Sequence, residues 1–318
     1  MKWTKIMVWI VVIGLSVCFF GRNHWNLTTE QTKGILNQYF LKNEEYSFSR
    51  MLFRMSNVLF ALESTERKEL TPSPVPVIPE SVPAAVSKTE PVLRNQTSFQ
   101  PNLSALQTMS LPFLPIESTS NPQVLIVHTH TSEGYFPEER TSDSQRNVIA
   151  TGEVIASYLT EQGIKVIHDK TVHDDDYNGS YSRCAETVEQ QLKKHPSIQI
   201  VLDVHRDAAV LEDGKSLRVI SEINGKQIGQ IMLVVGTNEG GLEHPTWETN
   251  LAFALRIQQA MDRVAPGLSR PLNIRKERFN QHLAPGMLIV EVAASGNSLE
   301  EAKEGALVFA KSLCLVLK

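Results

Sequence analysis

Short apolar runs of strand type alternate with amphipathic stretches of helical spacing across residues 123–318. An apolar run without polar alternation indicates a strand that is buried on both faces and needs a covering layer on each side. The order therefore predicts an α/β fold, a mostly parallel twisted sheet with helices on both faces. The expected strands are 124–127, 164–168, 198–204 and 287–292, and the expected helices are 147–162, 181–194, 247–264 and 298 to the C-terminus.

Local signals define several boundaries of these elements. Gly163 ends the first expected helix, and Ser298 with Glu301 forms a capping box at the start of the last one. The dipeptide Asn224-Gly225 is typical of a tight hairpin turn. We therefore expect residues 217–223 and 230–235 to form an antiparallel pair.

The N-terminus indicates a membrane anchor. Lys2 and Lys5 precede an apolar run from Ile6 to Gly21, with Trp3 placed as an interfacial anchor. The run is short for a span, but no small-x-small cleavage site follows it, so an anchor over residues 1–22 is favoured over a cleaved signal peptide. The two lysines place the N-terminus inside and the remaining chain outside the cytoplasmic membrane.

Two segments separate this anchor from the α/β region. Residues 23–70 contain apolar side chains at three- and four-residue steps and are expected to form a membrane-proximal helical segment. Residues 71–122 hold ten of the sixteen prolines, a density that favours extended chain, so we expect a disordered linker. The catalytic domain is then expected to span 123–318.

Charge and cysteine content exclude some classes of protein. The net charge is −4 and no basic stripe is present, so a nucleic-acid partner is not expected. Three cysteines are too few for a disulfide framework, and Cys18 lies in the apolar N-terminal run. At most one pair within the domain, Cys184 with Cys314, remains.

Potential metal ligands follow two of the expected strands. His130 and Glu133 stand in H-x-x-E spacing after the expected strand 124–127, and His205 directly follows the expected strand 198–204. The set predicts a catalytic zinc site with three protein ligands and an open fourth position. Strand alternation would place His128 on the same side as His130, so either histidine can be the first ligand. We favour His130, which leaves His128 as a donor to the transition state.

The other candidates surround this site. Glu291 lies inside an apolar strand, where burying an ionised carboxylate without a partner would cost several kcal/mol, so it should face a polar site and act as general base. Arg206 is expected to bind a substrate carboxylate, and Arg275 and Asn280 to contact the substrate as well. Asp203 or Asp207 is expected to fix the tautomer of the His205 imidazole.

With these residues identified, residues 123–318 resemble the stage II sporulation protein P family, which are membrane-anchored cell-wall hydrolases. The resemblance rests on an ordered series of motifs. They are His128-Thr-His-Thr-Ser-Glu133, His168-Asp-Lys-Thr171, Tyr177-Asn-Gly-Ser-Tyr181, Asp203-Val-His-Arg-Asp207, Val234-Val-Gly-Thr-Asn238, His244-Pro-Thr-Trp247, Phe279-Asn-Gln281 and Leu288–Val292.

The resemblance implies a fold similar to zinc-dependent N-acetylmuramoyl-L-alanine amidases and zinc carboxypeptidases. It implies cleavage of the amide between muramic acid and the stem peptide, and of peptide crosslinks, during engulfment. The implied partners are peptidoglycan, a glycan-strand-cleaving hydrolase and a membrane scaffold protein, between the mother-cell and forespore membranes. Ordinary amidases of this class place their glutamate ligand after a Gly-rich turn, which this chain lacks at Glu133.

Two other functions remain open from the sequence. One is a peptidase of the carboxypeptidase type that acts mainly on crosslinks. The other is a catalytically inactive wall-binding module that recruits or activates a partner hydrolase.

Overall fold

The computed structural model describes residues 91–116, 120–211, 214–223 and 225–318, which belong to one unit, Ser64–Lys318. The anchor expected at 1–22, the membrane-proximal segment at 23–70 and the linker up to residue 90 lie outside the described residues. Within the described ranges, no helix has the length and apolar character needed to cross a bilayer.

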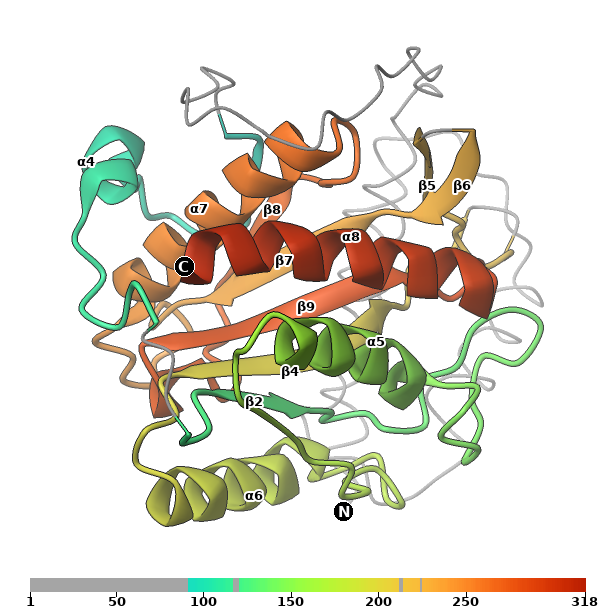
Figure 1. Cartoon of the computed structure of the whole chain (residues 1–318), viewed down its shortest axis with the longest axis horizontal. Coiled ribbons are helices and arrows are strands. Elements are labelled where there is room, and N and C mark those ends of the chain that lie inside the picture. The colour runs from blue at the N-terminus through green and yellow to red at the C-terminus, as the bar shows by residue number, and fades with distance from the viewer. Residues whose placement is uncertain (1–90, 117–119, 212–213, 224) are drawn as a thin grey trace, which may run out of the picture. The chain divides into compact units, whose positions relative to one another are not determined.

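A seven-stranded sheet forms the centre of the molecule (Figure 1). Its strand order is β1-β8-β7-β9-β4-β2-β3, and every neighbouring pair is parallel except β7 with β9. The strands are β1 (Leu93–Asn95), β2 (Val124–Val127), β3 (Val166–His168), β4 (Ile200–Asp207), β7 (Ile231–Gly236), β8 (Leu272–Arg275) and β9 (Gly286–Ala294).

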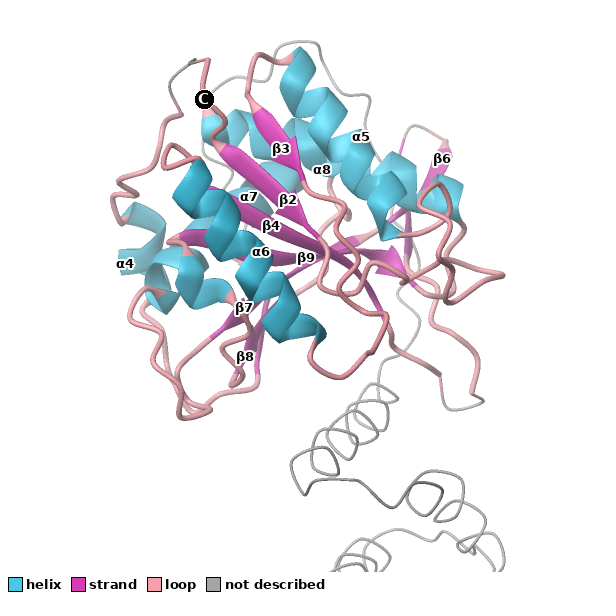
Figure 2. Cartoon of the chain, turned by 90° about the horizontal axis from the view of Figure 1, so that it is seen from below, coloured by secondary structure: helices cyan, strands magenta, loops and turns pink. Residues whose placement is uncertain are grey.

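Helices cover the two faces of the sheet unequally. On one face lie α5 (Val148–Glu161), α7 (Trp247–Val264) and α8 (Leu299–Leu317), and they share a large apolar core with the sheet. On the other face lies α6 (Ser180–Lys194), with a smaller core around Val127, Cys184 and Val201 (Figure 2). The short 3-10 helix η2 (Gln281–Leu283) contacts α6 and α7. The prediction of a mostly parallel sheet with helices on both faces is confirmed.

The capping signals in the sequence are confirmed too. The Asn147 side chain accepts from Ile149 N–H at the start of α5, and Gly163 has a φ of 85° just after its end. Ser298 and Glu301 form the expected capping box at the start of α8. These contacts satisfy backbone groups that a helix end leaves unpaired.

The hairpin was predicted with the wrong second strand. β5 (Ile220–Ile223) pairs with β6 (Lys226–Gly229) in a separate two-stranded sheet. The run 230–235 instead forms most of β7, which lies antiparallel to β9 in the main sheet. The turn at Gly225 is tight enough that the residues directly after it form the return strand, so β7 pairs elsewhere.

The linker prediction is wrong for residues 91–116. β1 pairs with β8, and α4 (Leu103–Thr108) packs against α7. Phe113 is buried, with its ring edge-on to Phe253 at a centroid distance of 5.3 Å. Prolines in this stretch fall between the elements, where a fixed φ and a missing N–H are tolerated. The folded domain therefore begins before residue 123.

Cys184 and Cys314 are both buried free thiols. Cys184 belongs to α6 and Cys314 to α8, so the sheet separates them. The one pairing that the sequence left open does not form.

Candidate active site

Three neighbouring strands bring four of the predicted site residues, His130, Glu133, His205 and Glu291, to one edge of the sheet. β2, β4 and β9 are parallel neighbours, so their carboxyl ends lie at the same edge. His205 of β4 is directly opposite Glu291 of β9 in the register. Side chains two residues apart in a strand share a face, so Asp203, His205 and Glu291 all lie on the face covered by α6.

His205 lies between two carboxylates. Its Nδ1 is 3.2 Å from Oε2 of Glu133, and its Nε2 faces Oδ1 of Asp203 at 3.0 Å, although that contact lacks hydrogen-bond alignment. Burial lowers the pKa of His205, but the charges of Asp203 and Glu133 outweigh it and raise that pKa well above the usual value. The H-x-x-E turn and the His205 strand therefore meet.

Glu133 is held in its ionised form. Burial alone would raise its pKa, but His205, Arg206 and His130 together lower the pKa to about 2. Its backbone is fixed as well, since Glu133 N–H donates to the His130 carbonyl and the Glu133 carbonyl accepts from Val148 N–H. The turn thus presents a permanently charged oxygen donor to the site.

His130 is a buried imidazole with a free ring nitrogen. Its Nδ1 has no hydrogen-bond partner in the described part of the chain, and its ring centroid is 5.4 Å from that of His205. Burial lowers the pKa of His130 to about 4 although the Glu133 charge opposes this, so the ring is neutral at pH 7. A neutral imidazole with an unused lone pair is a metal ligand by chemistry.

These donors fit zinc by type. Among the described residues, no three His, Cys, Asp or Glu side chains are already grouped as a metal cluster. The contacts are pairwise: Glu133 touches His205, and the His205 ring is edge-on to that of His130. Two imidazoles and a carboxylate are a donor set that zinc takes in hydrolases, and the unpaired nitrogen of His130 is the observation that supports it.

Glu291 faces this polar site rather than the core. It is partly exposed, and its Oε2 has no hydrogen-bond partner within the described residues. Burial, helped by the charges of Asp207 and Glu133, raises its pKa to about 8, although His205 and Arg206 act in the opposite direction. A carboxylate whose pKa is close to neutral is suited to accept and return a proton.

His128 lies elsewhere, and the strand alternation that placed it beside His130 was wrong. β2 ends at Val127, so alternation does not continue through the turn. The His128 ring contacts the Val204 carbonyl through Nδ1 at 2.8 Å and Nε2 of His168 at 2.9 Å. It packs against Gly152 of α5, on the opposite face. Both ring nitrogens of His128 are therefore in contact with other groups of the protein.

The guanidinium of Arg206 is also bonded within the protein. Arg206 is buried, and its guanidinium donates to the carbonyls of Gly134 and Glu139, while its backbone N–H donates to Glu133 Oε2. Successive strand residues point to opposite faces, which separates Arg206 from His205. Arg206 therefore holds the loop after Glu133 in place, and its binding to a substrate carboxylate stays a prediction.

The other two predicted substrate residues are also committed to the protein. Arg275 ends β8, which runs opposite to β9, so it lies at the far edge of the sheet from Glu291 and pairs there with Glu277 at 3.1 Å. Asn280 is buried, and its side chain donates to the Tyr181 carbonyl at 2.8 Å. Asn280 positions the first turn of α6 and is not a free contact.

Sequence reasoning missed the carboxylate Asp174, which organises the turn. Asp174 accepts from Thr131 Oγ1, from Ser132 and from Arg140 Nη2. Its position in an acidic, turn-rich loop gave no signal of this contact. Asp203 was anticipated only as a group that orients the His205 imidazole. It also accepts hydrogen bonds from Thr129 N–H at 2.8 Å and from Thr129 Oγ1 at 2.6 Å. Asp207, the alternative orienting group, instead binds Arg270.

Two tyrosines complete the wall of the site. Tyr177 stacks on the His130 ring at 4.5 Å and is half exposed, with the Arg140 guanidinium 5.2 Å from its centroid. Tyr181 meets the same histidine edge-on at 5.5 Å. Both come from the segment at and just before the start of α6, and the sequence marked them only as the ends of a family motif, Tyr177-Asn-Gly-Ser-Tyr181, without a role in the site.

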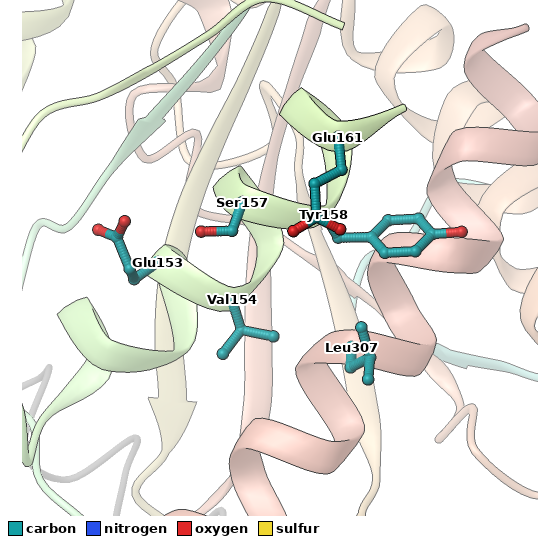
Figure 3. A pocket seen from close by; sticks show the side chains of 6 residues that line it. All are labelled: Glu153, Val154, Ser157, Tyr158, Glu161 and Leu307. Atoms are coloured by element: carbon teal, nitrogen blue, oxygen red, sulfur yellow. The ribbon is translucent and has the colours of Figure 1, made fainter. Parts of the chain in front are cut away.

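A depression lies between α5 and α8, on the opposite face of the sheet (Figure 3). It is lined by Glu153, Val154, Ser157, Tyr158, Glu161 and Leu307. It contains none of the predicted site residues.

With the geometry established, comparison with known proteins identifies the family. The sequence matches the family described as stage II sporulation protein P over residues 57–314, which is most of the chain. This chain belongs to the stage II sporulation protein P family. The resemblance that the motifs suggested is therefore confirmed.

Solved structures give a weaker comparison. The chain is similar to the N-acetylmuramoyl-L-alanine amidase AmiC2 of Nostoc punctiforme, with 12% identity, coverage of 62% of this chain and 97% of that one, and a TM-score of 0.36. The chain is also similar to an N-acetylmuramoyl-L-alanine amidase from Clostridium difficile 630. There the identity is 15%, the match covers 62% of this chain and 95% of that one, and the TM-score is 0.35. These TM-scores are too low to support an argument. No curated protein matches the sequence.

Proposed function

We propose that this protein is a sporulation peptidoglycan hydrolase that cleaves the amide between N-acetylmuramic acid and the L-alanine of the stem peptide, using zinc. One observation carries the proposal: His130, Glu133, His205 and Glu291 converge at one edge of the sheet from three separate segments of the sequence, the turn after β2 and the strands β4 and β9. Membership in the stage II sporulation protein P family supports the cell-wall substrate and the sporulation role.

His130, Glu133 and His205 would hold the zinc ion. When bound, zinc supplies a Lewis acid that polarises the amide carbonyl and lowers the pKa of a coordinated water to roughly 7. Asp203 contacts His205 from the side opposite to Glu133 and orients its imidazole. The Thr129 backbone and hydroxyl in turn hold Asp203 in place.

Glu291 performs the proton transfers in this proposal. Its free Oε2 accepts a proton from the attacking water, and the same oxygen returns that proton to the leaving amine nitrogen. Burial, helped by the nearby carboxylates of Asp207 and Glu133, raises its pKa and so strengthens it as a base. A general base of this kind contributes about 10²–10⁴-fold in rate.

Several parts of the biological setting belong to the same proposal. The chain is anchored by residues 1–22 in the cytoplasmic membrane, with its hydrolase domain between the mother-cell and forespore membranes. It acts beside a glycan-strand-cleaving hydrolase and a membrane scaffold protein. Cleavage of peptide crosslinks is a second activity of the same site.

Digestion of purified sacculi by the full chain with added zinc tests this function. Glu291→Gln should reduce product release by about 10²-fold or more while zinc remains bound, because an amide cannot accept the proton. Glu222→Gln, an exposed change on β5, is the matched control and should leave release unchanged. Near-normal activity of Glu291→Gln would exclude the general-base role.

The products separate the alternatives. Released peptides with a free N-terminal L-alanine identify an amidase, whereas fragments cut only at crosslinks identify a peptidase. Binding of the wild-type protein to sacculi without any release, with zinc present, would identify an inactive wall-binding module and overturn the proposal.

A further inference from the structure

Tyr181 is held in the site by three independent contacts. Its ring is edge-on to the His130 ring at 5.5 Å and lies 5.7 Å from the Phe279 ring. Its backbone carbonyl accepts from Asn280. Tyr181 is also in the first turn of α6, a helix that begins directly after Gly179. The φ of 86° at Gly179 suits glycine and sets the direction in which the helix starts.

The phenol of Tyr181 lies close enough to the catalytic carboxylates to interact with their charges. These carboxylates are those of Asp203, Glu291 and Glu133, which surround the proposed zinc site. The side chain is partly exposed, and within the described residues its hydroxyl makes no hydrogen bond. The Tyr181 hydroxyl is therefore an unused hydrogen-bond donor beside the site.

The site needs such a donor. Hydrolysis of an amide places negative charge on the carbonyl oxygen, and ionised carboxylates can only accept hydrogen bonds. The two donors that the sequence suggested, Arg206 and His128, are bonded to backbone carbonyls and to His168. Tyr177 is also less suited, because its ring is sandwiched between His130 and Arg140.

We propose that Tyr181 is a further catalytic residue, whose hydroxyl donates a hydrogen bond to the oxygen of the scissile amide as charge develops there. The proposal rests on the amide hydrolysis proposed above. The phenol keeps its proton throughout, so no bond to Tyr181 forms or breaks. Asn280 and Phe279 are positioning residues for this group, through the Tyr181 backbone and ring.

A single hydroxyl can be removed without changing the packing. In Tyr181→Phe the ring still meets His130 and Phe279, so zinc binding and melting temperature should match those of the wild type. The kcat should fall by about 100-fold with KM little changed, as when one donor to the developing oxyanion is lost. Tyr158→Phe, in the depression between α5 and α8, is the matched control and should have wild-type kinetics (Figure 3).

Ligand binding gives a second readout. A phosphinate that replaces the scissile amide with a tetrahedral centre should bind Tyr181→Phe about 10- to 100-fold more weakly than the wild type. A muramoyl dipeptide, which represents the uncharged ground state, should bind both proteins equally.

The outcomes distinguish this inference from the proposed function. An active wild type together with an unchanged kcat in Tyr181→Phe would overturn the role of Tyr181 alone. A variant that loses zinc or stability in proportion to its activity would overturn it too, because the ring and not the hydroxyl would then be responsible. A wild type that releases nothing from sacculi with zinc bound would overturn both.

Discussion

His205 is the residue on which the site depends most, because it links the H-x-x-E turn to the sheet. It contacts Glu133 from the turn and Asp203 from its own strand, and it is opposite Glu291 on the next strand. Each of these carboxylates has a different pKa because its surroundings differ. Glu133 is ionised beside two cationic groups, whereas the pKa of Glu291 is raised by burial and by neighbouring carboxylates.

The roles of individual residues were the hardest to predict. The choice of His130, His205 and Glu291 followed from strand ends and from the cost of a carboxylate in an apolar strand. The contacts of His128 and Arg206 were not anticipated, because their partners, the Val204 carbonyl and the loop at Gly134, are distant in the sequence. Whether a nitrogen of a histidine ring or of an arginine guanidinium is left without a hydrogen-bond partner depends on such tertiary contacts. No local sequence pattern encodes these contacts.

The packing of His128 can be tested at Gly152. A Cβ added there would lie 2.7 Å from Cε1 of His128 and 2.9 Å from Nε2 of His168, both in buried rings. Gly152→Ala should therefore destabilise the fold by about 1–3 kcal/mol, although alanine normally favours a helix. Thermal unfolding measures this, with Ser157→Ala on the exposed side of α5 as the control. A raised melting temperature in Gly152→Ala would show that the two rings do not pack as described.

Helices were predicted better than strand pairings. α7 has the predicted bounds, α5 ends just before the predicted Gly163, and α8 begins at its predicted cap, because end signals and apolar periodicity are local. β8 and β1 were missed, since each is short and its pairing joins residues far apart in the chain. The turn at Gly225 was predicted, but the partner of β7 was decided by the main sheet.

α7 also contains a carboxyl group that makes the stability depend on pH. Burial raises the pKa of Asp262 to about 6 from an ordinary value of 3.8. The folded state then holds this proton more tightly than the unfolded state, so the contribution of Asp262 to stability decreases as the pH rises from about 4 through 6. Asp262→Asn should raise the melting temperature at pH 7.5 and have little effect below pH 4. An equal difference at both pH values would contradict this.

The whole domain places its chemistry on one face of the sheet. Three helices cover the opposite face with the large core, whereas α6 covers only part of the face that carries Glu291 (Figure 2). The site lies beside α6, at the ends of β2, β4 and β9, in the usual position for a site in an open α/β sheet.

The central claim is that distant strand ends form one zinc site, and the zinc content of the purified full chain tests it most directly. We predict about one zinc per wild-type molecule, almost none in His205→Ala, and about one in His195→Ala, a control at the C-terminal end of α6. Full zinc content in His205→Ala would show that His205 is not a ligand and would contradict the account.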